Sequence, residues 1–195
     1  LLWGRLWRMG GTDTNATAGW HGWFISSYWL NLKMITRLFD IVARRTENDP
    51  TGVLLSAKEN GEWRTYSSRE VWDTASRLSG GLLSLDLANQ DLTPDAQEKI
   101  AIISPNRPEW IITDLAVQLS GAVLTPIYPT ISPQEIAYIL NEAGVRILFL
   151  ASKDLYERFR DAFAMVPTLT HVFSFEDVEG VTNWKEVMNN SHTPD

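Results

Sequence analysis

The sequence predicts an α/β fold in which a mainly parallel sheet is flanked by helices. Three short apolar runs, at 99–104, 123–128 and 145–150, are separated by two stretches with the period of a helix, at 107–120 and 133–143. Runs that are apolar throughout are typical of strands covered on both faces, and strand–helix–strand units of this length connect parallel strands through a right-handed crossover. Gly121 and Gly144 follow the two helical stretches, where a residue in the left-handed conformation commonly ends a helix.

The first 33 residues differ in composition from the rest of the chain. They hold five of the nine tryptophans and a net charge of +2 (three basic residues minus Asp13), which leaves −9 for residues 34–195. The aromatic residues between Trp20 and Trp29 are of types that settle at a bilayer interface, so a membrane-surface segment is one interpretation. However, the stretch has no long apolar run, no signal-peptide cleavage site and no sustained amphipathic period. We favour a Trp-rich leader, from read-through or cloning, ahead of a natural start at Met34. Deleting residues 1–33 should barely change the melting temperature.

The first regular element that we expect is a helix beginning near Thr36, whose side chain can serve as the N-cap. Asp49-Pro50 should end this helix, because the residue before a proline is biased away from the helical conformation. The apolar face expected for it comprises Leu38, Phe39, Val42 and Ala43.

A β-hairpin near 53–66 and a second helix should follow. The runs 53–58 and 62–66 flank Asn60-Gly61, and an Asn-Gly pair between such runs is the strongest short-range hairpin signal. Ser67 and Glu70 have the spacing of a capping box. The buried face expected for this helix comprises Val71, Ala75, Leu78 and Leu82. The acidic segment 86–98 is then predicted to be a connecting loop.

The two helices of the central region carry start signals of their own. Asn106 precedes Glu109 by three residues, and Ser132 precedes Glu135 by the same spacing, so each pair predicts a capping box. A proline stands in the first turn of both helices, at a position where it is favoured. The buried faces that we expect are Ile111, Ile112, Leu115, Ala116 and Leu119 for the first helix, and Ile136, Ile139, Leu140 and Ala143 for the second.

The last third of the chain continues the same alternation. Ser152 can cap a helix in which Leu155, Phe159 and Phe163 recur every four residues, and Pro167 follows its end. A fourth strand is predicted at 170–175, and a short helical turn at 183–188. We expect the four strands to form one mainly parallel sheet.

Composition excludes several classes of function. The net charge of −7, without any cluster of lysine and arginine, argues against a nucleic-acid-binding surface. The chain has no cysteine, which removes disulfides, thiolate nucleophiles and cysteine-based metal sites. The three histidines, His21, His171 and His192, fit no metal-ligand spacing.

A few residues could carry chemistry, but each has a simpler explanation. Glu176, Asp177 and Glu179 could serve as paired carboxylates, although a solvated acidic turn is the more ordinary interpretation. Ser132 at a helix N-terminus could hold an anion, but such a serine is usually only a cap. The doublets Gly10-Gly11 and Gly80-Gly81 lie in no phosphate-loop motif. We therefore assign no catalytic, cofactor-binding or metal-binding residue.

Two segments nevertheless resemble a known family. The stretch 63–82, WRTYSSREVWDTASRLSGGL, and the stretch 99–144, which contains NRPEW and GAVLTPIYPT, are similar to the opening of adenylate-forming acyl-CoA synthetases. The resemblance is strongest to the long-chain fatty acid–CoA ligases and runs from about Met34 to Asn183. It implies that residues 34–195 form the N-terminal part of the large AMP-binding (adenylation) domain.

The resemblance also implies a reaction. Family members use ATP and Mg²⁺ to convert a carboxylic acid to an acyl-adenylate, and then transfer the acyl group to coenzyme A. The family's phosphate loop, adenine-binding segment and catalytic lysine come after the region matched here. We therefore expect this chain to be truncated before the phosphate loop, inactive alone, unable to bind these cofactors tightly, and prone to self-association through uncovered apolar surface.

Two alternatives stay open. The chain could be a freestanding, non-catalytic α/β module that binds a nucleotide or a protein partner, with its crevice near Ser104-Pro105-Asn106 and Pro129-Thr130 at the carboxyl ends of the strands. Within the enzyme class, the substrate could be another acyl or aryl acid. The expected location is cytoplasmic, with peripheral contact with a membrane as a second option.

Overall fold

A five-stranded parallel sheet is the centre of the fold. The computed structural model describes residues 35–85, 93 and 96–189. The strands run in the order β4-β3-β5-β6-β7, and all four neighbouring pairs are parallel. Their bounds are β3 (Lys99–Ile103), β4 (Val123–Ile127), β5 (Ile147–Leu150), β6 (His171–Ser174) and β7 (Thr182–Asn183). The predicted fold class and all four predicted strands are confirmed, and the two-residue strand β7 is an addition.

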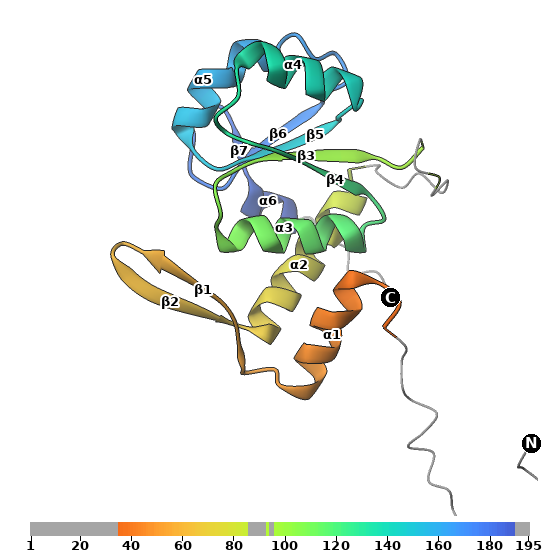
Figure 1. The fold of residues 1–195 in the computed structure, drawn as a ribbon, viewed down its shortest axis with the longest axis vertical. Helices are drawn as coiled ribbons and strands as arrows, with labels where there is room; N and C mark the ends of the chain where they lie inside the picture. Colours follow the sequence, from red (N-terminus) through yellow and green to blue (C-terminus); the bar gives the residue numbers. More distant parts are fainter. Residues whose placement is uncertain (1–34, 86–92, 94–95, 190–195) are drawn as a thin grey trace, which may run out of the picture. The chain divides into compact units, whose positions relative to one another are not determined.

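Helices cover both faces of this sheet, as Figure 1 shows. Along β3, Ile100 and Ile102 join a core with residues of α2, α3 and α6, whereas Ala101 and Ile103 join a second core with α4 and α5. This alternation follows from the two-residue period of a strand. The helices are α1 (Leu38–Asn48), which packs on α2, α2 (Ser68–Leu83), α3 (Pro108–Leu119), α4 (Pro133–Glu142), α5 (Lys153–Phe163) and α6 (Trp184–Asn189).

The predicted hairpin is present, formed by β1 (Val53–Glu59) and β2 (Glu62–Ser67). Asn60 and Gly61 at its tip have φ values of 51° and 88°, so both residues of the turn adopt the left-handed region. A two-residue turn of this kind matches the twist of the flanking strands and explains the Asn-Gly pair. The hairpin extends away from the helices in Figure 1, with Tyr66 buried at its base.

Helix α2 lies flat on the core, as its pattern predicts. Val71, Ala75, Leu78 and Leu82 are all fully buried. Gly81 in its last turn allows α6 to approach closely, because a Cβ atom there would lie 2.0 Å from the backbone oxygen of Val187. Gly81 of the Gly80-Gly81 doublet therefore serves helix packing.

Three of the predicted helix starts differ from the structure. The N-cap of α1 is Arg37 and not Thr36. The backbone N–H and the hydroxyl of Thr36 both donate to the Asp40 carboxylate. The N-cap of α3 is Arg107 and not Asn106, because the Glu109 carboxylate pairs with the Arg107 guanidinium and forms no capping box.

At α2, the Ser67 hydroxyl accepts from the Glu70 backbone N–H as expected, but the Glu70 carboxylate binds Arg64. The reciprocal capping box is therefore not observed there. It is confirmed for Ser132 and Glu135, which have no other charged partner among the hydrogen bonds of the described residues.

Two residues of the predicted apolar faces are exposed instead. Leu38 in α1 is 72% exposed, and Ile111 in α3 is 37% exposed. Both lie at the margin of their helical face, where a small rotation of the helix about its axis determines whether a side chain is buried in the core or exposed to solvent. The remaining members of these two faces are buried or half-buried. Gly121 and Gly144 have φ values of 76° and 63°, which confirms the predicted helix ends.

Strand β4 forms one edge of the sheet in the described part of the chain. The Val123 N–H donates to the Glu98 carbonyl at 2.8 Å, so the polar backbone groups of Val123 face β3. Because these groups alternate in direction along a strand, those of Leu124 and Pro126 face outward. Pro126 offers no N–H on this side, and edge positions are where a proline is tolerated in a sheet.

Two sequence predictions lie outside the described residues. These are the leader at 1–33 and most of the loop at 86–98. Among the helices that the structure describes, none is long and apolar enough to span a bilayer.

Candidate functional site

The strand order creates a topological switch point between β3 and β5. After β3 the chain crosses through α3, on one face, to β4, and it returns through α4, on the other face, to β5. In open α/β sheets, ligands bind in the crevice at the carboxyl ends of the two strands that flank such a point. Here that position, which we call the switch-point crevice, lies between residues 104–107 after β3 and residues 151–152 after β5. Of the segments expected at the crevice, Ser104-Pro105-Asn106 follows β3 at the switch point, whereas Pro129-Thr130 follows β4, which lies on the other side of β3 from β5.

The side chain of Arg107 occupies this crevice. Its guanidinium donates to both carboxylate oxygens of Glu109, at 2.7 and 3.1 Å, and to the carbonyl oxygen of Ala151 at 3.1 Å. The Glu176 carboxylate lies 3.8 Å away, and the guanidinium carbon is 5.4 Å from the centre of the Phe175 ring. Hydrogen bonding to Glu109 raises the pKa of Arg107 above its ordinary value. Arg107 therefore bridges the ends of β3, β5 and β6.

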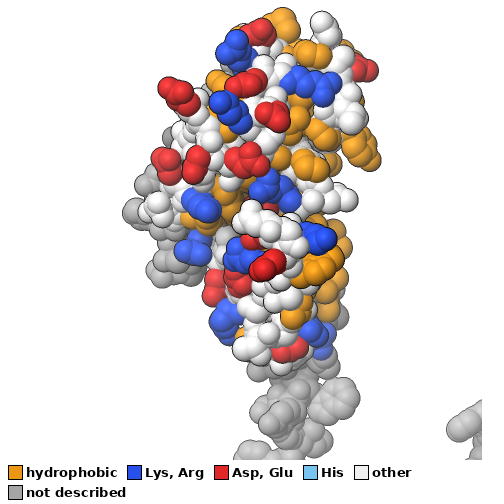
Figure 2. Space-filling view, turned by 90° about the vertical axis from the view of Figure 1, so that its left-hand side faces the viewer, with side chains coloured by type: hydrophobic (Ala, Val, Ile, Leu, Met, Phe, Trp, Pro, Cys, Tyr) orange, Lys and Arg blue, Asp and Glu red, His pale blue; other side chains and the backbone are white. Residues whose placement is uncertain are grey.

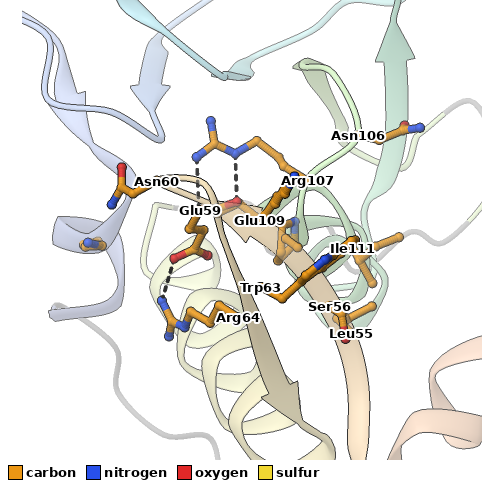
Figure 3. A pocket seen from close by; sticks show the side chains of 14 residues that line it. Leu55, Ser56, Glu59, Asn60, Trp63, Arg64, Asn106, Arg107, Glu109 and Ile111 are labelled. Atoms are coloured by element: carbon orange, nitrogen blue, oxygen red, sulfur yellow. Dashed lines mark hydrogen bonds and ion pairs between the residues drawn. The ribbon is translucent and has the colours of Figure 1, made fainter.

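Beside this crevice, the hairpin and the start of α3 enclose a cleft of about 850 Å³, which we call the hairpin cleft. Figure 3 shows residues of β1 and β2 facing the first turn of α3 across it. Trp63, which is 71% exposed, and Ile111 provide apolar surface, while Lys58 and Lys185 provide positive charge. Its other lining residues are Leu55, Ser56, Ala57, Glu59, Asn60, Arg64, Asn106, Arg107, Pro108 and Glu109. The volume is within the range of small-molecule sites, but the cleft is open to solvent.

The carboxylate of Glu59 in this cleft is already engaged. It accepts hydrogen bonds from the Tyr66 hydroxyl and from Arg64, the latter at 3.4 Å, and Arg64 also pairs with Glu70 at 2.8 Å. Hydrogen bonding from Tyr66 lowers the pKa of Glu59, whereas burial raises the pKa of Tyr66. A carboxylate held ionised in this way is poorly suited to take up a proton in catalysis. Glu59 is best explained as part of the hairpin's structure.

Tyr66→Phe should destabilise the chain in a pH-dependent way. Hydrogen bonds to charged groups contribute roughly 1.5–3 kcal/mol, and because Glu59 is partly exposed we expect about 1 kcal/mol here. Since the pKa of Glu59 is lowered by folding, the contribution is complete above the unfolded-state pKa and disappears as the pH falls through the folded-state pKa. Urea unfolding of both proteins at several pH values between neutral and acidic checks this. An equal difference at every pH would contradict the role of Glu59.

Comparison with known proteins places the chain in a family. A family model described as AMP-binding enzyme matches residues 39–194. The chain belongs to the AMP-binding enzyme family. The match covers the whole described fold from the second residue of α1, so the sheet, both helical layers and the hairpin are all part of the family's domain. The resemblance inferred from the sequence is confirmed.

Curated relatives of this AMP-binding chain include fatty acid ligases. The chain is 26% identical over 132 residues to long-chain-fatty-acid–CoA ligase FadD15 of Mycobacterium bovis, covering 68% of this chain and 21% of the relative. It is 28% identical over 121 residues to long-chain-fatty-acid–CoA ligase 5 of Rattus norvegicus, covering 62% of this chain and 17% of the relative. The chain thus spans about a fifth of the length of the relatives that it matches.

Solved structures of AMP-binding enzymes share the fold. The long-chain-fatty-acid–CoA ligase FadD1 of Archaeoglobus fulgidus superposes with a TM-score of 0.66 at 19% identity, covering 79% of this chain and 30% of that structure. The anthranilate CoA ligase AuaEII, solved in complex with anthranoyl-AMP, gives a TM-score of 0.65 at 18% identity, covering 80% and 27%. At these identities, the likeness shows the common fold alone.

Of the other described residues that the sequence singled out in this AMP-binding chain, Glu176 lies beside Arg107 at the crevice. The Ser132 hydroxyl is engaged with Glu135 as a helix cap. In the acidic turn, Asp177 accepts from Asn183, whereas Glu176 faces Arg107. Gly10-Gly11, His21 and His192 lie outside the described residues, and the described part of the chain contains no cluster of acidic and histidine residues that could hold a metal.

Arg107 was missed as a site residue by the sequence analysis. Its signal was its position, in the short loop between a buried strand and the next helix and two residues before Glu109. The assignment of no catalytic residue in this chain stays a prediction.

Proposed function

We propose that this chain is the N-terminal part of an acyl-CoA ligase that activates long-chain fatty acids. The observation that carries the proposal is the family match over residues 39–194 together with the long-chain-fatty-acid–CoA ligases among the relatives. In the complete protein, ATP and Mg²⁺ would convert the acid to an acyl-adenylate, and coenzyme A would then take up the acyl group. The complete protein would therefore bind a fatty acid, ATP and CoA.

Within that protein, the role proposed for these residues is structural. They would supply the first strands of the large domain and part of the wall of the active site. The carboxylates near the switch point, Glu109 and Glu176, are both paired with Arg107. Phosphate groups need preorganised N–H donors and cations, which we expect from other parts of the complete protein. We assign none of the family's catalytic residues to a position in this chain.

Two other functions remain candidates. The fold is shared with an anthranilate CoA ligase, so an aryl acid is a second candidate for the substrate. A non-catalytic module is less well supported, because Arg107 fills the switch-point crevice where such a module would be expected to bind its ligand.

The experiment that tests the proposal uses the complete protein encoded by the gene. Purified protein is incubated with ATP, Mg²⁺ and CoA and a panel of acids that includes hexadecanoate, octanoate, benzoate and anthranilate, and thioester formation is measured. We expect the largest kcat/KM with the long-chain acid. A preference for an aryl acid would reassign the substrate, and thioester formation from none of the acids would favour the non-catalytic module.

Location and assembly are further proposals. We propose a cytoplasmic protein that makes peripheral contact with membranes, since its substrates would include long-chain acids. For the isolated chain we propose self-association, because Trp63 and other apolar side chains are exposed. Co-sedimentation with lipid vesicles and light scattering test these two proposals separately. A protein that stays in the supernatant would contradict the membrane contact. A chain that is monomeric at high concentration would contradict the self-association.

A further inference from the structure

The surroundings of Arg107 have the chemistry of a cation site. They contain the carboxylates of Glu109 and Glu176, the carbonyl oxygen of Ala151 and the face of the Phe175 ring. Carboxylates and carbonyl oxygens only accept hydrogen bonds, and an aromatic face attracts cations. These groups come from α3 and from the segments that follow β5 and β6. They converge on one guanidinium, whose side chain is 25% exposed.

The charge of this cluster disfavours anions. With Arg107 included, the three ionised side chains sum to −1, and without it they would sum to −2. Lys58 and Lys185 line the adjoining hairpin cleft and bring positive charge near the cluster. Figure 2 shows acidic and basic side chains interspersed over the face that it draws. A phosphate or carboxylate entering the crevice would meet two carboxylates and would have to compete with Glu109 for the guanidinium.

We propose that Arg107 is a built-in occupant of the switch-point crevice, which holds the ends of β3, β5 and β6 together in place of a ligand and closes the crevice to phosphates and carboxylates. In this role Arg107 is a positioning residue. The proposal does not depend on which acid the complete protein activates.

The geometry explains why the occupant is an arginine. Its planar guanidinium meets both oxygens of Glu109 in a two-pronged contact while a third N–H reaches Ala151. A lysine ammonium is a point charge and cannot reproduce a planar, two-pronged contact of this kind. An empty crevice should therefore accept a small planar cation better than a spherical one.

The test is chemical rescue of Arg107→Ala with methylguanidinium, at concentrations far below those that denature proteins. We expect the variant to melt about 2–4 °C below the original chain, and methylguanidinium to restore at least half of that difference. Sodium chloride at the same ionic strength controls for screening. Arg158→Ala is the matched control variant, because the Arg158 guanidinium donates to the carbonyls of Pro129 and Ile131 at an exposed site and pairs with no carboxylate in the described structure. Methylguanidinium should stabilise neither this control nor the original chain.

Two further measurements decide the outcome. If Arg107→Ala does not fold, Arg107→Gln replaces it, since glutamine fills part of the space and leaves the two carboxylates unpaired. Pyrophosphate is titrated into the original chain and should not raise its melting temperature. Rescue in the Arg107 variant alone supports the proposal. Equal effects of methylguanidinium on all three proteins, or a stabilisation by pyrophosphate that is lost in the Arg107 variant, would overturn it.

Discussion

The purified 195-residue chain should show no fatty-acid-dependent exchange of labelled pyrophosphate into ATP. Adenylation develops negative charge at the reacting phosphorus and on the departing pyrophosphate, and enzymes stabilise this charge with preorganised N–H donors, cations and Mg²⁺. Removing one such donor typically costs about 10²- to 10³-fold in rate, so a chain without the whole phosphate loop should react at the background rate. The groups near its switch point are two carboxylates already paired with Arg107.

The measurement requires monodisperse protein, ATP, Mg²⁺ and hexadecanoate, with a reaction lacking protein as the baseline. The complete protein, assayed in parallel, is the positive control. Exchange by the short chain clearly above the baseline, and dependent on the fatty acid, would show that nucleotide chemistry resides in these residues after all. Such a result would also contradict the assignment of no catalytic residue.

The largest loss of stability should come from Phe149→Ala. Phe149 is fully buried at the centre of β5, and its ring centre lies 5.4 Å from that of Phe173 and 6.1 Å from that of Phe175. Truncating a buried phenylalanine to alanine removes its apolar contacts and leaves a cavity, at a cost of about 3–5 kcal/mol. Because the aromatic cluster joins β5 to β6 and to the segment after β6, the cavity cannot close without moving two strands.

The free energy of unfolding, measured with urea, checks this prediction. Tyr138→Ala is the matched control, because it also truncates an aromatic side chain, but Tyr138 on α4 is 67% exposed. Surface substitutions of this kind usually change stability by no more than about 0.5 kcal/mol. A similar, small effect of both substitutions would mean that the core around Phe149 is loosely packed.

Features that depend on neighbouring residues could be predicted from the sequence. The turn at Asn60-Gly61 and the helix ends at Gly121 and Gly144 require left-handed backbone, and few residues adopt it readily. The parallel sheet followed from apolar runs separated by helical stretches. These signals are local in the sequence.

Helix starts were less predictable, because charged side chains have alternative partners. Glu109 and Glu70 have the spacing of capping-box residues, yet each pairs with an arginine, Arg107 and Arg64. A charge-assisted pair competes well with a bond to a backbone N–H, and nothing in the local sequence reveals whether the partner is near. Ser132 and Glu135 have no such competitor in the described structure, and there the prediction was correct.

The site itself needed the strand order. Arg107 and Ala151 are 44 positions apart, and they meet only because β5 lies beside β3 while β4 lies on the other side. The apolar runs of these strands do not encode which two become neighbours. The segment after β3 could therefore be named from the sequence, whereas its neighbour across the switch point, the segment after β5, could not.

Pro126 limits how the sheet can grow beyond β4. If two copies of the chain paired their β4 edges in antiparallel fashion about this residue, two proline rings would face each other where a ladder needs two N–H donors. Fibre-like stacking through this edge should be disfavoured for the same reason, since such assemblies select against proline. Any strand added here, from the complete protein or from another molecule, would have to bond on either side of Pro126, at Leu124 and Tyr128. Pro126 thus restricts which strands can pair with this edge of the sheet, because an added strand must do without a hydrogen bond at that position.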